Sequence, residues 1–237
     1  MKYEKIVEGK FISRLNRFIA EVEVFGEKTR VHVKNTGRLG ELLLPGTTVY
    51  LEDFEKDMRN RKMRFSLIGV EKKVGVGQML VNIDSQAPNK VVGEALRSGS
   101  MKLPGLLNLA EIKPEFTYGN SRLDFYVRDI EGVEGFVEVK GVTLETDGIA
   151  SFPDAPTERG IKHINELAEI VKKGKNAYII FVLQMKPMKA FRPNDERHRA
   201  FGDALRKAYA QDVKVMAFQC NVTESTLTLD KEIPVEL

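Results

Sequence analysis

The stretch Tyr178-Ile179-Ile180-Phe181-Val182-Leu183 is hydrophobic from end to end, with no alternation of apolar and polar residues. Such a run is typical of a strand covered on both faces, so we expect a central strand at 177–183. Helical patterns lie on either side of it, at about 157–173 and 195–210, and a further strand is expected at about 213–222. Helices that alternate with apolar strands predict an α/β layer structure.

Upstream of this core, three more strands are expected at about 112–118, 122–128 and 135–140. A short helical stripe formed by Val91, Val92, Ala95 and Leu96 precedes them and is closed by Ser98-Gly99. The chain from 223 to 237 is a short strand-like tail without an assigned place.

The first ~80 residues have a different pattern, with four or five short strands and no good helix. The alternating runs 18–24 and 29–33 flank a hairpin turn at Gly26-Glu27-Lys28. A small barrel follows, and the oligonucleotide-binding (OB) type is a candidate that the pattern does not demand. The predicted organisation is a barrel over residues 1–81 and an α/β unit over residues 82–237.

The composition excludes several classes of protein. One cysteine, Cys220, rules out an internal disulfide framework, and with only three histidines the chain is poorly equipped for structural zinc. No signal peptide is visible, and no window approaches the ~18 apolar residues of a membrane span. We therefore expect a cytoplasmic protein without a membrane partner. The net charge of +3 permits nucleic-acid binding without arguing for it.

The residues that carry chemistry are predicted on a hairpin formed by the strands 122–128 and 135–140. Side chains alternate faces along a strand, so Glu138 and Lys140 share a face. Opposed residues in a hairpin have a constant sum of numbers, which a turn centred near residue 131 or 132 sets at about 262 or 264. Either even sum places Asp124 on the face of Glu138 and Lys140, whereas an odd sum places it on the other face.

Two carboxylates gathered among apolar neighbours are costly to bury unless a cation compensates them. Mg²⁺ is the usual ion for an oxygen-only site, with Asp124 and Glu138 as its protein ligands. Lys140 would then orient or deprotonate the attacking water, or steady a phosphate. The alternative is an exposed, salt-bridged strand face, which spacing alone favours because such triplets are frequent by chance.

The helix that begins near Pro156 and Thr157 strengthens the case for an anion site. Arg159 and Lys162 lie near its N-terminus, where they oppose the helix dipole, and an arriving phosphate would relieve this. His163 is placed beside the proposed carboxylates. The alternative is a solvated basic turn with His163 pointing to solvent.

The barrel half carries basic residues near Phe11 and Phe18. A basic groove with aromatic platforms is typical of single-strand binding. The candidates for nucleic-acid contact are Arg14, Arg17, Lys34, Asn35 and Arg38. In the alternative, both rings are core and the arginines are merely solvated, and for Phe18, inside an alternating strand, a core position is the favoured interpretation.

Five stretches are distinctive, and the last is the most specific: 14–18 (RLNRF), 32–38 (HVKNTGR), 121–125 (SRLDF), 137–144 (VEVKGVTL) and 152–163 (FPDAPTERGIKH). In them the chain resembles the sugar fermentation stimulation protein A family, nearly from end to end. The resemblance implies an OB-type barrel followed by a PD-(D/E)XK restriction-endonuclease-like α/β domain with a mixed central sheet, α+β overall.

The resemblance also implies residue roles. Asp124 matches the first acid of the motif, Glu138 and Lys140 match its E-x-K, and Glu94 matches the acid that precedes the hairpin, as a further ligand or base. Arg122, in the matching stretch, joins the phosphate-binding candidates. Leu123 replaces the proline of the motif's name.

The function implied is a DNA-binding protein with a nuclease site that depends on Mg²⁺ or Mn²⁺. Binding-only members of nuclease folds exist, so a non-cleaving, non-specific DNA-binding regulator linked to sugar (maltose) metabolism stays open. A carbohydrate-binding protein is a third interpretation, since OB barrels also bind oligosaccharides. The absence of tryptophan speaks against it.

Overall fold

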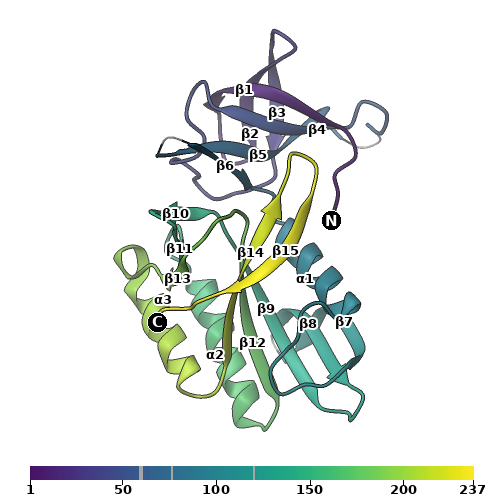
Figure 1. Ribbon diagram of the computed structural model, residues 1–237, viewed down its shortest axis with the longest axis vertical. Helices are drawn as coiled ribbons and strands as arrows, with labels where there is room; N and C mark the ends of the chain where they lie inside the picture. The colour runs from purple at the N-terminus through teal and green to yellow at the C-terminus, as the bar shows by residue number, and fades with distance from the viewer. Residues whose placement is uncertain (59–60, 76, 120) are drawn as a thin grey trace.

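The computed structural model describes residues 1–58, 61–75, 77–119 and 121–237. Its first half is a β-barrel that stands above a larger α/β unit (Figure 1). The barrel strands are β1 (Ile6–Arg14), β2 (Ile19–Val24), β3 (Glu27–Val33), β4 (Thr48–Asp53), β5 (Phe65–Val74) and β6 (Gly77–Asn82).

The barrel closes because β3 pairs in parallel with β5, while the remaining neighbours in the order β3-β2-β1-β4-β5-β6 are antiparallel. Alternate residues such as Val22, Val31 and Leu67 are fully buried inside it. At the β2–β3 turn Gly26 has φ +81°, a conformation that glycine adopts without strain. The predicted OB-like barrel is confirmed.

The second half is built on a six-stranded mixed sheet with the order β15-β14-β12-β9-β8-β7. Its strands are β7 (Leu109–Tyr118), β8 (Ser121–Asp129), β9 (Glu134–Val142), β12 (Asn176–Leu183), β14 (Lys214–Val222) and β15 (Leu227–Ile233). β12 runs parallel to both β9 and β14, and residues 177–183 are at most 1% exposed. The predicted central strand is therefore confirmed, and the tail forms β15 against β14.

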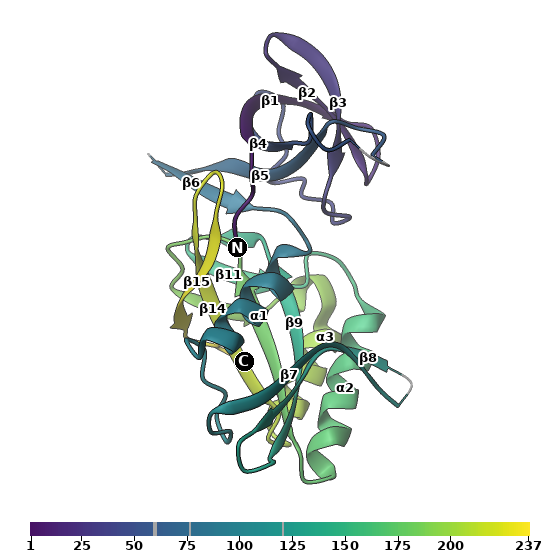
Figure 2. The same ribbon diagram turned by 90° about the vertical axis from the view of Figure 1, so that its right-hand side faces the viewer.

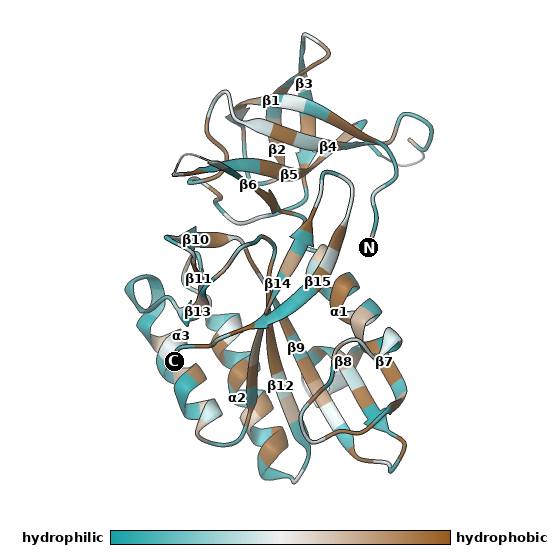
Figure 3. Cartoon of the chain, viewed as in Figure 1, coloured by the Kyte–Doolittle hydropathy of each residue, from teal (hydrophilic) through white to brown (hydrophobic). Residues whose placement is uncertain are grey.

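Helices cover both faces of this sheet (Figure 2). α1 (Ala87–Ser98) packs Val92 and Leu96 on one face, and α2 (Glu158–Lys172) and α3 (Asp195–Tyr209) cover the other. The hydrophobic colours gather in the inner strands between the helices (Figure 3). Among the described residues, none of the helices has the length and apolar character needed to cross a membrane.

A small sheet that was not predicted from the sequence lies between the main sheet and the barrel (Figure 1). It has the order β10-β11-β13, with β10 (Leu144–Thr146), β11 (Ile149–Phe152) and β13 (Ala190–Pro193). Strands this short carry almost no periodic pattern, which explains the omission.

Hydrogen bonds join the barrel to the second half. Asn82 N donates to the carbonyl of Gln184 (2.9 Å), and Gln184 Nε2 donates to Asn82 Oδ1 (2.9 Å). On the other side of the junction, Tyr3 N donates to the carbonyl of Ser225 (2.8 Å) in the β14–β15 turn. The junction thus has a defined geometry, and it positions the loops discussed below.

Candidate metal and phosphate site

The register of the β8–β9 hairpin decides which side chains meet. Phe125 pairs with Val137 and Val127 with Gly135, which is the smaller of the two even registers expected. The pairing runs no further toward Asp124, and its carboxylate occupies the edge of β9 instead, where Oδ2 accepts from Val139 N (2.7 Å). Asp124 therefore lies where β8 begins to separate from β9.

Asp124 is half-buried, and its second oxygen is also held. Oδ1 accepts from Nδ2 of Asn89 (2.6 Å), which lies in the first turn of α1. Burial, followed by the negative charge of Glu138, raises the pKa of Asp124 above its usual range despite these two hydrogen bonds. The Asp124 carboxylate is thus held in place by two neutral donors, and a nearby cation would stabilise its charged form.

Glu138 is only 3% exposed and lies under α2. Its Oε1 accepts from Lys140 Nζ (2.5 Å) and from Nδ1 of His163. Burial would raise the pKa of Glu138, but the hydrogen bond from His163 and the charge of Lys140 outweigh it and lower the pKa below its usual range. Glu138 and Lys140 share a face, as expected, and His163 lies against the carboxylate rather than in solvent.

One atom at this site is left without a partner. Glu138 Oε2 is buried and accepts no hydrogen bond from any described residue. A buried carboxylate oxygen in that condition is costly, and a cation is one means of compensating it. The donor set consists of oxygens, which suits Mg²⁺ or Mn²⁺.

Within the described part of the chain, no group of three or more His, Cys, Asp or Glu side chains is gathered to hold a metal ion. An ion here would rest on Asp124 and Glu138 alone. That number of protein ligands fits Mg²⁺, which commonly keeps several waters and uses substrate phosphate oxygens as well.

Two basic residues, Arg159 and Lys162, lie in the first turns of α2, the helix that carries His163. Arg159 is exposed at the start of α2, and its Nε lies 3.4 Å from Nε2 of His163. His163 in turn contacts Glu138, so Arg159 is connected to the buried carboxylate through one side chain. Lys162 is also exposed and lies 3.7 Å from Glu166. Both remain available to an incoming anion.

Asp124 lines a pocket of about 480 Å³ together with Asn89, Lys90 and Arg97 of α1. These three residues were not predicted from the sequence. The available signal was the spacing of Lys90 and Arg97, which are seven residues apart and so lie on one face of a helix.

Glu94 does not join the site in this structure, and its role as a further ligand or base stays a prediction from the resemblance. Its Oε2 accepts from the Met1 ammonium group (2.7 Å), and its side chain is 56% exposed. At ~3.6 residues per turn, Glu94 lies about 140° around the helix from Asn89, which does reach Asp124.

The barrel candidates fall into two groups. Arg14 is a structural residue, because its guanidinium donates to the carbonyls of Gly37 (2.6 Å), Asn35 (2.7 Å) and Arg17 (2.8 Å). Burial lowers the pKa of Arg14. The donors of Arg14 shape a loop, so the structure gives no support to nucleic-acid binding by Arg14, which stays a prediction from the sequence.

Lys34 and Asn35 are also committed to the fold. Lys34 Nζ lies 3.1 Å from Glu52 and 3.2 Å from Asp84, which neutralise it, and Asn35 Nδ2 donates to the carbonyl of Ile83 (3.0 Å). The structure therefore gives no support to the prediction that Lys34 and Asn35 contact nucleic acid, and that prediction stays untested.

Arg17, Arg38 and Arg122 are exposed, and Arg122 pairs with Glu115 at the β7–β8 edge. Phe18 is 44% exposed under Arg17, whose guanidinium carbon lies 4.8 Å from the ring centre, so the core position favoured for Phe18 is wrong. Phe18 falls in the turn just before β2, outside the alternating strand. Phe11 is core, at 3% exposure.

The fold and the site together define a class of protein in which an OB-type barrel is joined to a mixed α/β domain with paired acids and a lysine on its sheet. Residues 12–83 match the family profile described as the SfsA N-terminal OB domain, and residues 86–226 match that of the sugar fermentation stimulation protein RE domain. The chain belongs to the sugar fermentation stimulation protein family, and the resemblance in sequence is thereby confirmed.

Relatives match along the whole chain. A sugar fermentation stimulation protein homolog of Desulfitobacterium hafniense (strain Y51) is 50% identical over 237 residues, covering 100% of this chain and 99% of the relative. The homolog of Clostridium beijerinckii is 48% identical, with 100% of both chains covered. The structure of Pyrococcus furiosus SfsA in complex with Ca²⁺ superposes with a TM-score of 0.86 at 28% identity, covering 100% of this chain and 98% of that one.

Proposed function

We propose that this protein is a divalent-metal-dependent nuclease that hydrolyses phosphodiester bonds, with DNA as its substrate and the cytoplasm as its setting. The observation that carries the proposal is the buried, unpartnered Oε2 of Glu138, close enough to Asp124 for its charge to raise that residue's pKa. The Pyrococcus furiosus relative forms a complex with Ca²⁺, which supports a family preference for oxygen-seeking ions.

The protein groups have separable roles. Asp124 and Glu138 would hold Mg²⁺ or Mn²⁺, which when bound supplies positive charge to the scissile phosphate and acidifies a water. Asn89 and the Val139 amide keep the Asp124 carboxylate from rotating. His163 and Lys140 hold Glu138 in the same way.

Lys140 has a second role in this proposal. Its ammonium group is only partly exposed and lies beside the carboxylate, where it can orient the attacking water or steady a phosphate oxygen. Arg159 and Lys162 at the start of α2, and Lys90 and Arg97 on α1, would bind the flanking phosphates of the strand.

One observation favours a second candidate, the non-cleaving DNA-binding regulator. Oε1 of Glu138 already accepts from both Lys140 and His163, an arrangement that also satisfies a purely structural ion pair. That candidate predicts salt-sensitive DNA binding that survives loss of the carboxylates.

The experiment measures cleavage and gel shift on single-stranded, duplex and branched DNA and on RNA, with Mg²⁺, Mn²⁺ or EDTA. We compare wild type with Glu138→Gln and with Glu131→Gln, a matched control in the exposed β8–β9 turn. We expect metal-dependent cleavage that Glu138→Gln abolishes and Glu131→Gln retains. Binding without cleavage under either metal would establish the regulator instead.

A further inference from the structure

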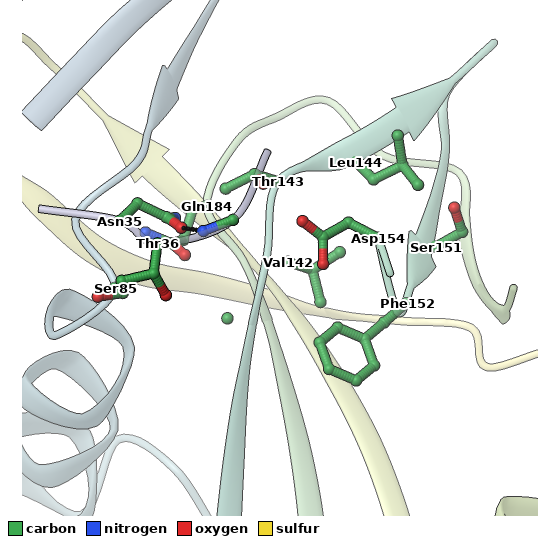
Figure 4. Close-up of a pocket in the computed structure, with 12 residues that line it drawn as sticks. Asn35, Thr36, Ser85, Val142, Thr143, Leu144, Ser151, Phe152, Asp154 and Gln184 are labelled. Atoms are coloured by element: carbon green, nitrogen blue, oxygen red, sulfur yellow. Dashed lines mark hydrogen bonds between the residues drawn. The ribbon is translucent and has the colours of Figure 1, made fainter. Parts of the chain in front are cut away.

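A polar pocket of about 300 Å³ lies between the barrel and the second half of the chain (Figure 4). The barrel contributes the loop of Asn35, Thr36 and Gly37, and the second half contributes residues 141–144, Ser151, Phe152, Asp154 and Gln184. Two of the distinctive stretches of the sequence, 32–38 and 152–163, thus face each other across one cavity. The nuclease proposal leaves this pocket unused.

The lining of the pocket carries negative charge and no positive charge. Its single charged residue is Asp154, whose carboxylate points into the space (Figure 4) and makes no hydrogen bond or ion pair within the described ranges. Gly37 lies directly against it, because a Cβ on Gly37 would come within 2.8 Å of Asp154 Oδ2. A larger residue at 37 would require the Asp154 side chain or the loop to shift.

The amide groups at the pocket present acceptors rather than free donors. Gln184 Nε2 is committed to Asn82 Oδ1 and to the carbonyl of Asp84, which leaves Oε1 on the side of Gly141 and the pocket. Asn35 uses both ends of its amide, with Ile83 and Gly37. The group that enters the pocket must therefore bring N–H or O–H donors for Asp154 and for Gln184 Oε1, and it must carry no negative charge of its own, because Asp154 would repel it.

The position of the pocket points to the substrate strand. Gly141 and Val142 line it and directly follow Lys140 on β9. Ser85 lines both this pocket and the pocket that contains Asp124. A group bound here would therefore lie next to a phosphate held at the carboxylates.

We propose that this pocket takes an unpaired guanine of the bound strand, with Asp154 accepting its two adjacent N–H donors. Guanine presents N1–H and its 2-amino group side by side, in the spacing of the two oxygens of a carboxylate. The hydroxyls of Thr36, Thr143 and Ser151 complete the polar lining. Extruded bases are commonly bound by hydrogen bonds to this edge. The inference rests on the proposed function only in taking nucleic acid as the ligand.

The test measures binding in EDTA, so that no cleavage is needed. The probes are fluorescein-labelled dT oligomers with a single dG placed at each position in turn, read by anisotropy. We expect one position of dG to tighten binding about tenfold, as a bidentate base contact does. Replacing that dG by deoxyinosine, which lacks the 2-amino group, should remove most of the gain.

The variants are Asp154→Asn and, as a control with the same change of charge, Asp147→Asn in the exposed β10–β11 turn. Asp154→Asn should abolish the dG preference and leave binding of plain dT oligomers unchanged, whereas Asp147→Asn should keep the preference. A preference retained in Asp154→Asn, or no preference at any position in wild type, overturns the inference. Free guanosine monophosphate binding as tightly as the dG oligomer also overturns it, in favour of a free-nucleotide site.

The two proposals fail separately. Metal-dependent cleavage without any base preference removes the pocket assignment and leaves the nuclease. A dG preference that depends on Asp154, in a protein that never cleaves, removes the nuclease and leaves the pocket.

Discussion

Nδ1 of His163 hydrogen-bonds to Oε1 of Glu138, and the two side chains are only 7% and 4% exposed. An ionised carboxylate only accepts, so His163 is the donor and Glu138 depends on it. His163→Ala removes one hydrogen bond to the charged Oε1 and leaves that from Lys140, so it should lower the free energy of unfolding by about 1.5–3 kcal/mol. Urea denaturation at pH 7 measures this.

His163→Gln keeps an N–H donor and should recover part of that loss, while Asn165→Ala, exposed on the same helix, should change little. Equal stability of His163→Ala and wild type would show that the contact contributes nothing.

Two aspartates of β8 should respond to pH in opposite directions. The folded-state pKa of Asp124 is raised, so its contribution to stability is present below its unfolded pKa of ~3.9 and is lost as pH rises through the folded value. Asp124→Asn removes that loss. It should therefore stabilise the metal-free protein at pH 7, with an advantage that shrinks as the pH falls toward 4.

Asp129 is the matched case, because backbone N–H groups, Leu107 first, lower its pKa. Its contribution is present above its unfolded pKa and is lost as pH falls through the folded value. Asp129→Asn should therefore destabilise at pH 7, and the loss should fade in acid. Urea midpoints from about pH 2 to pH 8, in EDTA, give both trends, because the Asp129 effect fades only below its unfolded pKa of ~3.9. Parallel behaviour of the two variants contradicts the assignment.

Arg14 and Arg17 lie three residues apart in sequence, and their substitutions should affect different properties: stability for Arg14 and nucleic-acid binding for Arg17. Arg14→Ala removes several hydrogen bonds from a charged donor to loop carbonyls and should cost about 2–3 kcal/mol of stability. Arg17→Ala should stay within about 0.5 kcal/mol, as exposed substitutions do. If Arg17 contacts phosphate, its loss should reduce the salt dependence of nucleic-acid binding by about one unit of slope. Urea midpoints and binding at several salt concentrations separate the two roles.

Glu94→Gln should leave metal binding and any cleavage unchanged, because Glu94 is bonded to Met1 rather than turned toward Asp124. Asn89→Ala, on the same helix, should weaken metal binding, since it removes one of the two hydrogen bonds that hold the Asp124 carboxylate. Calorimetric titration with Mn²⁺ measures both. Loss of metal binding in Glu94→Gln would instead support the role as ligand or base that the resemblance implies.

Features that depend on residues close together in the sequence could be predicted from it. The unbroken apolar run at 177–183 predicted its own burial, and the even register of the β8–β9 hairpin followed from the position of its turn. Strand periodicity and turn placement depend on neighbours a few residues away, so a single sequence contains them.

Partners distant in sequence were not predictable. Glu94 meets Met1, and Asn89 meets Asp124, only once α1 has docked on the sheet. Arg14 looks like a free basic residue until the 35–38 loop folds over it. The pocket at Asp154 requires two loops more than one hundred residues apart, which no pattern along the chain could bring together.

The hydrogen bonds between Asn82 and Gln184 have a consequence for how the molecule unfolds. Two halves joined by a linker of a few residues would ordinarily unfold independently. Here, separating them breaks the hydrogen bonds between Asn82 and Gln184 on the two sides of the junction. The chain should therefore lose its structure in one cooperative transition with a single calorimetric peak. A substitution that changes the free energy of unfolding of the barrel should then change the stability of the carboxylate site by the same amount.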